Sequence, residues 1–232
     1  MRELLQTGLT QLGLDPANAS ALEQYGRLLI EKNKVMNLTA ITDPREVAQK
    51  HMLDCAALLG AADFDGKRLI DVGTGAGFPG LVLKLCCPSL DLTLLDSLQK
   101  RVDWLSALTE TLDAPAACVH GRAEEYGRDG DWREQFDLAT ARAVADLRIL
   151  CELCLPFLKV GGLFLAMKAE DCQAEVDAAG RAVSLLGGRL LPSYTYQIPG
   201  TSLVRRVIRV EKISHTPEKY PRRFAKLQKA PL

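Results

Sequence analysis

A glycine-rich stretch at residues 71–80 constrains the fold more than any other part of the sequence. It reads Asp-Val-Gly-Thr-Gly-Ala-Gly-Phe-Pro-Gly, follows an apolar run, and leads into a second apolar segment after Pro79. Glycine is favoured where the backbone takes a positive φ or passes close to a ligand. We therefore expect a strand, a tight turn and a helix, with a ligand held between the strand's carboxyl end and the helix's first turn.

Two motifs overlap in this stretch. Residues 75–80 fit the pattern G-x-G-x-x-G of dinucleotide-binding loops, a weak signal that also occurs in turns that bind no nucleotide. The wider pattern is more specific, because Asp71 stands two residues before the first of three alternating glycines. This spacing places Asp71 at the carboxyl edge of the sheet, where open α/β sheets bind ligands. An NAD-dependent oxidoreductase is one class of enzyme that such a loop allows.

Length and composition suit one α/β domain with an appendage. The chain has 232 residues, of which 47% are hydrophobic and 25% charged, enough to bury a full core. It contains no apolar run long enough to span a membrane and does not begin like a signal peptide, so we expect a cytoplasmic enzyme. The seven cysteines are an odd set that does not cluster with the three histidines. We expect buried free thiols, including Cys151 and Cys154, rather than a metal site or disulfides.

The amino-terminal part of the chain reads as helices. Apolar periodicity predicts helices over residues 4–12, 15–34 and 47–59, and the second begins with Asp15 as N-cap and Pro16 in the first helical position. His51 and Asp54 are three residues apart and therefore share a helix face. Such a pair is either a hydrogen-bonded structural contact or a catalytic dyad, and both interpretations stay open.

From residue 67 onward, strands and helices alternate. Strands are expected over residues 68–72, 90–95, 116–119, 136–143 and 163–167, separated by helices over 80–87, 98–112, 147–158 and 171–186. The strands expected over 189–197 and 203–213 have no helix between them. This order predicts a parallel sheet that finishes with an antiparallel pair at one edge.

Asp96 ends the second predicted strand, about 20 residues after the glycine loop. A carboxylate in this position can accept hydrogen bonds from both hydroxyls of a ribose. Asp96 could equally cap the helix predicted from residue 98, and the two roles can coexist. Glu124 and Glu125, taken alone, read as the first turn of another helix, stabilised by its dipole.

Four segments together resemble one family. They are the loop at residues 71–80, Gly-Arg-Ala-Glu at 121–124, Thr-Ala-Arg at 140–142 and the basic carboxyl-terminal tail. In this order they resemble the ribosomal RNA small subunit methyltransferase G family of class I S-adenosylmethionine-dependent methyltransferases. The resemblance implies a Rossmann-like fold with a seven-stranded, mostly parallel sheet whose last strand is antiparallel. It divides the chain into a helical segment (1–60), a cofactor-binding core (61–213) and a basic tail (214–232).

The resemblance also implies a set of residues that bind S-adenosylmethionine: Gly73, Phe78, Asp96, Ser97, Leu98, Ala123, Glu124 and Arg142. It implies no metal. A guanidinium at position 142 could also reach the methionine carboxylate or an RNA phosphate. The purely structural alternative is an ion pair between Arg142 and Asp146.

The predicted reaction follows from the family and from two absent motifs. The fourth strand ends without the Asn-Pro-Pro-Tyr used on exocyclic amines, and no Pro-Cys dipeptide occurs that could attack a pyrimidine. The target atom must then be nucleophilic already, as guanine N7 is. The resemblance implies N7 methylation of one guanine in a loop of 16S ribosomal RNA, free or in an assembling small subunit. We expect the enzyme to be a monomer. No catalytic acid or base is assigned, so a non-catalytic RNA- or nucleotide-binding module is the alternative.

The carboxyl-terminal tail is strongly basic. Residues 205–232 hold nine lysines or arginines against two acidic residues, although the whole chain has no net charge. This asymmetry favours a polyanionic partner, with Tyr220 and Phe224 available to stack on bases. The alternative is a solvated, partly disordered tail. If the tail is an RNA arm, removing it after Ile213 should weaken RNA binding and leave cofactor affinity intact.

Overall fold

The fold is built on one seven-stranded sheet, seen in a computed structural model that describes residues 1–142 and 145–232. The strand order is β3-β2-β1-β4-β5-β7-β6, and β7 runs antiparallel to both of its neighbours. The predicted topology, including the reversed last strand, is confirmed; Ala143, which the sequence placed in the fourth strand, lies outside the described residues. The strands are β1 (Arg68–Val72), β2 (Asp91–Asp96), β3 (Ala117–His120), β4 (Phe136–Arg142), β5 (Leu158–Ala169), β6 (Gly188–Gln197) and β7 (Val204–Lys212).

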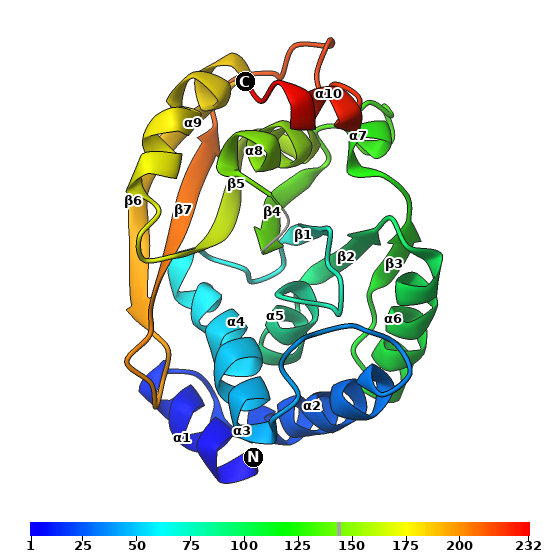
Figure 1. Ribbon diagram of the computed structural model, residues 1–232, viewed down its shortest axis with the longest axis vertical. Coiled ribbons are helices and arrows are strands. Elements are labelled where there is room, and N and C mark those ends of the chain that lie inside the picture. The colour runs from blue at the N-terminus through cyan, green and yellow to red at the C-terminus, as the bar shows by residue number, and fades with distance from the viewer. Residues whose placement is uncertain (143–144) are drawn as a thin grey trace.

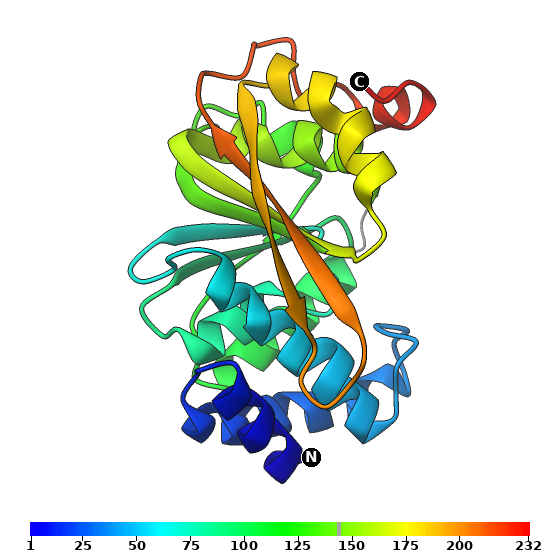
Figure 2. The ribbon, with the colours of Figure 1, turned by 90° about the vertical axis from the view of Figure 1, so that its left-hand side faces the viewer.

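Helices cover both faces of the sheet (Figures 1 and 2). Neighbouring strand residues point to opposite faces, so Leu69 belongs to one buried cluster and Ile70 to the other. The first face is covered by α5 (Gly80–Cys86), α6 (Gln99–Thr111) and the amino-terminal helices. The second is covered by α8 (Leu147–Cys154), α9 (Gln173–Leu185) and α10 (Phe224–Lys229).

The amino-terminal segment is helical, as expected, but less regular than the sequence indicated. Its elements are α1 (Arg2–Gln11), η1 (Pro16–Asn18), α2 (Ala19–Asn33), α3 (Pro44–Val47), η2 (Ala48–Leu53), α4 (Asp54–Ala56) and η3 (Ala57–Ala61). Asp15 accepts a hydrogen bond from the Ala17 amide, which confirms its capping role, and Asp43 caps α3 in the same way. The single helix predicted over 47–59 includes one π-helical stretch, η2, which carries His51. Such stretches are often found at functional sites.

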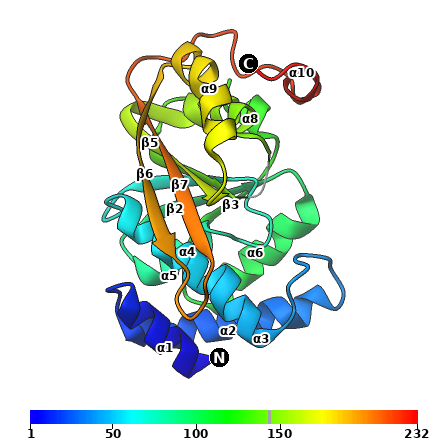
Figure 3. The same ribbon diagram turned by 60° about the vertical axis from the view of Figure 1, so that its left-hand side comes forward.

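The β6–β7 hairpin connects the carboxyl-terminal part of the sheet to the amino-terminal helices (Figure 3). It extends along the amino-terminal helices, where Gln49 Nε2 donates a hydrogen bond to the Gly200 carbonyl over 2.8 Å. The Tyr196 hydroxyl donates to an Asp54 carboxylate oxygen over 2.8 Å. These contacts hold the helical segment against the sheet, and the residues that make them are about 140 positions apart in the sequence.

Two boundaries in the middle of the chain differ from the prediction. The helix predicted to reach residue 158 ends at Cys154 and continues as the short turn η4 (Leu155–Phe157). Pro156 supplies no N–H and disrupts a continuing α-helix. β5 then starts at Leu158, five residues before the predicted strand, and contains Gly161 at φ +90°. The predicted burial of Cys151 and Cys154 is confirmed, and both are free thiols on α8.

The carboxyl-terminal tail is folded, so the interpretation of it as a partly disordered segment is wrong. Tyr220 and Leu227 belong to the second buried cluster. Arg222 donates to the fully buried Glu152 of α8 over 2.6 Å from Nη2. Because Tyr220 is only 6% exposed, it cannot stack on an RNA base as the sequence suggested. No helix among the described residues is long and apolar enough to cross a membrane.

Candidate active site

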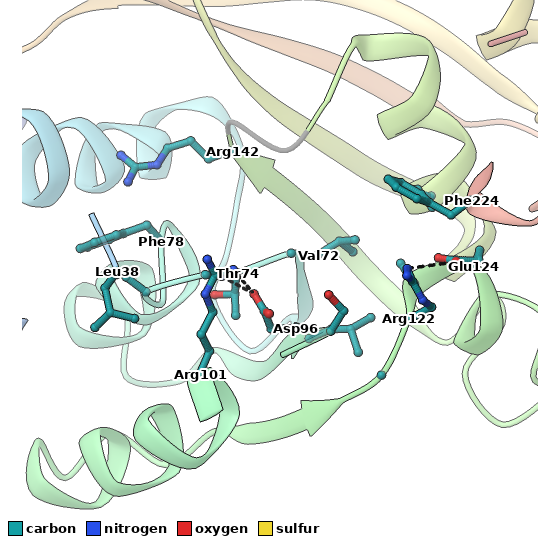
Figure 4. Close-up of a pocket in the computed structure, with 18 of the residues that line it drawn as sticks. Leu38, Val72, Thr74, Phe78, Asp96, Arg101, Arg122, Glu124, Arg142 and Phe224 are labelled. Atoms are coloured by element: carbon teal, nitrogen blue, oxygen red, sulfur yellow. Dashed lines mark hydrogen bonds and ion pairs between the residues drawn. The ribbon is translucent and has the colours of Figure 1, made fainter. Parts of the chain in front are cut away.

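A cavity of about 570 Å³ opens at the carboxyl ends of β1, β2 and β4. This is the edge at which open α/β sheets bind ligands. Figure 4 shows that it extends from Phe78 and Arg142 at one end, past Asp96, to Glu124 and Phe224 at the other. The volume lies in the range typical of small-molecule sites.

The glycine loop forms one wall of the cavity, and its backbone conformations favour glycine over other residues. Gly73, Gly75 and Gly77 all have positive φ, between +61° and +99°. A Cβ on Gly77 would lie 2.6 Å from the Tyr25 hydroxyl oxygen. That hydroxyl donates to the Ala76 carbonyl over 2.5 Å, so α2 supports the loop from behind.

Asp71 closes the loop and does not line the cavity. Its Oδ2 accepts hydrogen bonds from the Thr74 hydroxyl over 2.7 Å and from the Gly80 amide over 2.9 Å. The side chain is fully buried, and burial raises the pKa of the Asp71 carboxyl to about 6. Its Oδ1 is buried and has no hydrogen-bond partner among the described residues. Asp71 thus joins the end of β1 to the start of α5 and sets the shape of the turn.

Asp96 lines the cavity, but it does not cap the following helix as predicted, because the N-cap of α6 is Leu98 and no side chain among the described residues caps that helix. Asp96 instead forms the turn before the helix. Its Oδ2 accepts from the Gly75 amide over 2.8 Å, and Oδ1 accepts from the Leu98 amide over 3.0 Å. The carboxylate is 3% exposed, with Arg101 Nη1 at 3.5 Å from Oδ2. A carboxylate has about four lone-pair positions, so capacity remains to accept hydrogen bonds from a ligand.

The structure brings together most of the residues predicted to bind cofactor. Those that line the cavity are Gly73, Phe78, Asp96, Ser97, Ala123, Glu124 and Arg142. Leu98 is the exception: its side chain is 42% exposed, and it is not among the described residues that line the cavity. Leu98 enters the site only through its amide, which donates to Asp96.

Arg142 joins the sheet to the amino-terminal helices. Its Nη1 lies 3.4 Å from Asp54 Oδ2 and donates to the Lys50 carbonyl over 3.2 Å. The alternative pairing with Asp146 is wrong, because Asp146 caps α8 and pairs with Arg148 at 2.9 Å. Both His51 and Asp54, which the sequence placed on one helix face, therefore contact Arg142.

The hydrogen bonds of His51 fix its protonation state. A guanidinium can only donate, so His51 Nδ1 accepts from Arg142 Nη2 over 3.0 Å. The proton is then on Nε2, which donates to the Thr39 hydroxyl over 2.8 Å. Burial, reinforced by the Arg142 charge, lowers the pKa of His51 to about 4. His51 is thus neutral at pH 7, and both of its nitrogens are engaged.

Phe78 is enclosed by this cluster. Its ring stacks on the His51 ring with centroids 4.6 Å apart, and the Arg142 guanidinium carbon lies 4.9 Å from its centroid. The Tyr25 ring stacks on it with centroids 5.2 Å apart. Stacked rings and a cation over an aromatic face are both favourable arrangements. The cluster rigidifies one end of the cavity.

Sequence reasoning missed several residues of the site. Leu38 and Thr39 line the cavity from the loop before α3, and Arg101 lines it from the first turns of α6. Phe224 lines it from the tail. Phe224 carried a signal, as an aromatic residue among basic ones, but the sequence assigned it to RNA binding and not to this cavity. No group of three or more metal-binding side chains occurs within residues 1–142 and 145–232.

The fold and the site together define a class of protein. A structure of TYW2 from M. jannaschii in complex with AdoMet has a TM-score of 0.53 at 12% identity and covers 71% of this chain and 77% of that one. A putative RNA methyltransferase from Pyrococcus horikoshii gives a TM-score of 0.53 at 15% identity and covers 76% and 89%. The chain therefore has the Rossmann-like methyltransferase fold, with its cavity at the glycine loop.

Sequence relatives narrow this class to one family. A family profile described as rRNA small subunit methyltransferase G matches residues 18–198. Ribosomal RNA small subunit methyltransferase G of Symbiobacterium thermophilum is 47% identical over 240 residues, covering 100% of this chain and 98% of the relative. The protein of the same name from Lachnoclostridium phytofermentans is 44% identical, covering 97% and 95%. The chain belongs to the rRNA small subunit methyltransferase G family.

Membership of this family confirms the predicted class of enzyme and its cofactor, S-adenosylmethionine. The NAD-dependent oxidoreductase suggested by the G-x-G-x-x-G match is wrong. That motif occurs here as part of the longer loop that Asp71 closes at Gly80.

Proposed function

We infer that this chain transfers a methyl group from S-adenosylmethionine to N7 of one guanine in a loop of 16S ribosomal RNA. The observation that carries the inference is a single cavity that joins Asp96 and Glu124 to the buried His51–Arg142 cluster, in a chain 47% identical to a small subunit rRNA methyltransferase. One part of the cavity suits an adenosine, and the other lies beside the residues that hold the amino-terminal helices to the sheet.

The residues present fit the cofactor. Asp96 offers a buried carboxylate to the ribose, and Gly75 leaves the space beside it open, with the nearest atom 4.0 Å from a hypothetical Cβ. When bound, S-adenosylmethionine supplies a methyl group activated by a positively charged sulfur. Ser97, Ala123 and Glu124 would hold the adenine side, with Leu98 acting through the turn that its amide forms with Asp96. The methionine part would lie towards Gly73, Phe78 and Arg142.

The chain's own contribution to the reaction is binding and alignment. The lone pair of guanine N7 is unprotonated at neutral pH, so no residue needs to remove a proton from it. His51 is suited to a structural role and not to proton transfer, because it is neutral and already hydrogen-bonded at both nitrogens. It holds Arg142 and the Phe78 ring in place. Correct alignment of two reactants can contribute about 7 to 11 kcal/mol to lowering a barrier.

The three segments of the chain have different roles. Residues 1–60 act as a helical segment beside the substrate end, 61–213 as the cofactor-binding core, and 214–232 as a tail that presents exposed cations to RNA. The acceptor is 16S RNA, free or in an assembling small subunit. The enzyme acts as a monomer in the cytoplasm.

The test is transfer of labelled methyl from S-adenosylmethionine to 16S RNA and to small ribosomal subunits, followed by cleavage specific for 7-methylguanine. We expect one cleaved position in at least one of the two substrates, and less methylation by an Asp96→Ala variant at a cofactor concentration that does not saturate it. Cofactor binding without transfer to either substrate would contradict the proposal and favour a non-catalytic binding module. Transfer without 7-methylguanine cleavage would place the methyl group on another atom.

A further inference from the structure

The adenine end of the cavity is completed by the tail. Phe224 is the first residue of α10, and its half-buried side chain lines the same cavity as Asp96 and Glu124. Figure 4 shows its ring at the end of the cavity opposite Arg142, beside Glu124 and Arg122. The rest of that end is formed by the sheet edge and α7 (Ala123–Tyr126).

The position of Phe224 is fixed by contacts on both sides of it in the sequence. Before it, the Arg222 amide and guanidinium both donate to Glu152, at distances between 2.6 and 3.1 Å. Arg128 Nε also donates to the Pro221 carbonyl. After it, Leu227 is completely buried against the second face of the sheet. Because Glu152 lies on α8 next to the cavity residue Leu153, these contacts hold α10 against the wall of the cavity.

The chemistry of this end suits a purine. An aromatic side chain that lines a cavity offers dispersion contacts and stacking to a flat base such as adenine. The Arg122 guanidinium carbon lies over the Phe224 ring, 5.8 Å from its centroid, and this cation–π contact helps to hold the ring in place. Asp96, the residue proposed to bind the ribose, lines the same cavity.

We propose that Phe224 is an adenine-binding residue of the cofactor site, supplied by the tail. The proposal rests on the proposed function, because it takes S-adenosylmethionine as the ligand of this cavity. It replaces the idea that the aromatic side chains of the tail serve RNA alone. The tail then has two functions on different surfaces. Phe224 completes the cofactor site, and the exposed lysines remain available to bind RNA.

Binding measurements on four proteins test this assignment. S-adenosylmethionine and adenosine are titrated by calorimetry into the wild type, Phe224→Ala, Phe224→Leu and Phe224→Tyr. We expect Phe224→Ala to weaken both ligands by the same factor, about tenfold, since base stacking on an aromatic side chain contributes on this order. Phe224→Tyr should bind within about twofold of the wild type, and Phe224→Leu should lose most of the affinity although it keeps the apolar packing of α10.

Lys226→Ala is the matched control, because Lys226 is exposed on the same helix and is not among the described residues that line the cavity. It should bind both ligands as the wild type does. Unchanged adenosine affinity in Phe224→Ala overturns the proposal, and so does wild-type affinity in Phe224→Leu, which would show that the ring acts only by filling space. A wild type that binds no S-adenosylmethionine would refute the proposed function itself, an outcome distinct from either of these.

Discussion

Arg142 donates a hydrogen bond from Nη2 to Nδ1 of His51 over 3.0 Å, which leaves the imidazole neutral with its proton on Nε2. The contact joins the end of β4 to η2, so one hydrogen bond spans 91 positions of sequence. A protonated His51 could not accept it, and two positive charges would then face each other in a buried site. The pH dependence of stability should report this contact.

His51 should contribute a loss of stability on acidification between pH 6.5 and 4, because the unfolded His51 binds a proton that the folded one binds only near pH 4. The decrease in unfolding free energy from this group should reach about 3 kcal/mol. Below pH 4 both states are protonated, and the contribution changes no further. Urea unfolding at pH 7, 5.5 and 4.5, of the wild type and of His51→Gln, measures the difference.

The comparison with His51→Gln is necessary because Asp71 titrates in the same window with the opposite sign. Burial raises the pKa of the Asp71 carboxyl to about 6, so protonation of Asp71 favours the folded state between pH 6 and 3.8. The difference between the two proteins cancels this term. An identical pH dependence in both would show that His51 is not held neutral by burial and Arg142.

Asp54→Ala should be strongly destabilising. Asp54 is 4% exposed and accepts from Tyr196 and Arg142, so its removal leaves the Arg142 side chain, only 16% exposed, without its carboxylate. Breaking a buried ion pair in this way typically costs about 3 to 5 kcal/mol. Asp103→Ala, which removes an exposed carboxylate on α6, should change the unfolding free energy by less than about 0.5 kcal/mol. Equal urea midpoints for the two variants would contradict the prediction.

Asp96→Ala should weaken S-adenosylmethionine binding by at least about tenfold, since hydrogen bonds to a charged group contribute about 1.5 to 3 kcal/mol each. It should also lower stability, because the Gly75 and Leu98 amides lose their acceptor. Asp91→Ala is the control: it removes an exposed acid at the other end of the same strand. Calorimetry at a temperature where both variants are folded separates affinity from stability. Unchanged affinity in Asp96→Ala would show that Asp96 does not bind the ribose.

Exposed lysines of the tail should account for its RNA binding. Replacing Lys219, Lys226 and Lys229 by alanine should reduce the slope of log affinity against log salt by about 2, since each lost phosphate contact contributes about 0.7 on a single strand. Cofactor affinity should stay the same. The control replaces Arg27 and Arg181, exposed on α2 and α9, and should keep the slope. A slope that the lysine variant leaves unchanged would show that the tail is not an RNA arm.

Removal of the whole tail after Ile213 is a less specific test than the sequence suggested. It would leave the Glu152 carboxylate buried without Arg222 and would expose the surface that Tyr220 and Leu227 cover. It would also remove Phe224 from the cavity. We therefore expect the truncated chain to lose stability and cofactor affinity together.

The sheet was predictable because its signals are local. Each parallel strand is a short apolar run followed by a turn, and the lack of a helix between β6 and β7 indicates an antiparallel pair. Asp96 could be found in the same way, from its place at the end of a strand. The exposure of the Leu98 side chain was not predictable, because it depends on the turn that the Leu98 amide forms with Asp96.

The contacts that complete the cavity were not predictable, because they depend on packing between distant segments. Nothing near Arg142 in the sequence indicates that His51 and Asp54 receive its hydrogen bonds, and nearby Asp146 was the more obvious partner. Tyr196 and Tyr25 likewise form hydrogen bonds with residues 142 and 51 positions away in the sequence. In the tail, the charge pattern concealed Tyr220 and Leu227, two core residues spaced among exposed lysines.

The cavity wall formed by Phe224 has a consequence for synthesis of the protein. Phe224 is translated much later than the other described residues that line the cavity, because the last of these is Leu153. The sheet itself is complete once β7 has been made. A nascent chain at that stage has its glycine loop and Asp96 in place beside a cavity that is still open on one side. The site acquires its final shape only when translation has passed codon 224 and α10 has docked on α8.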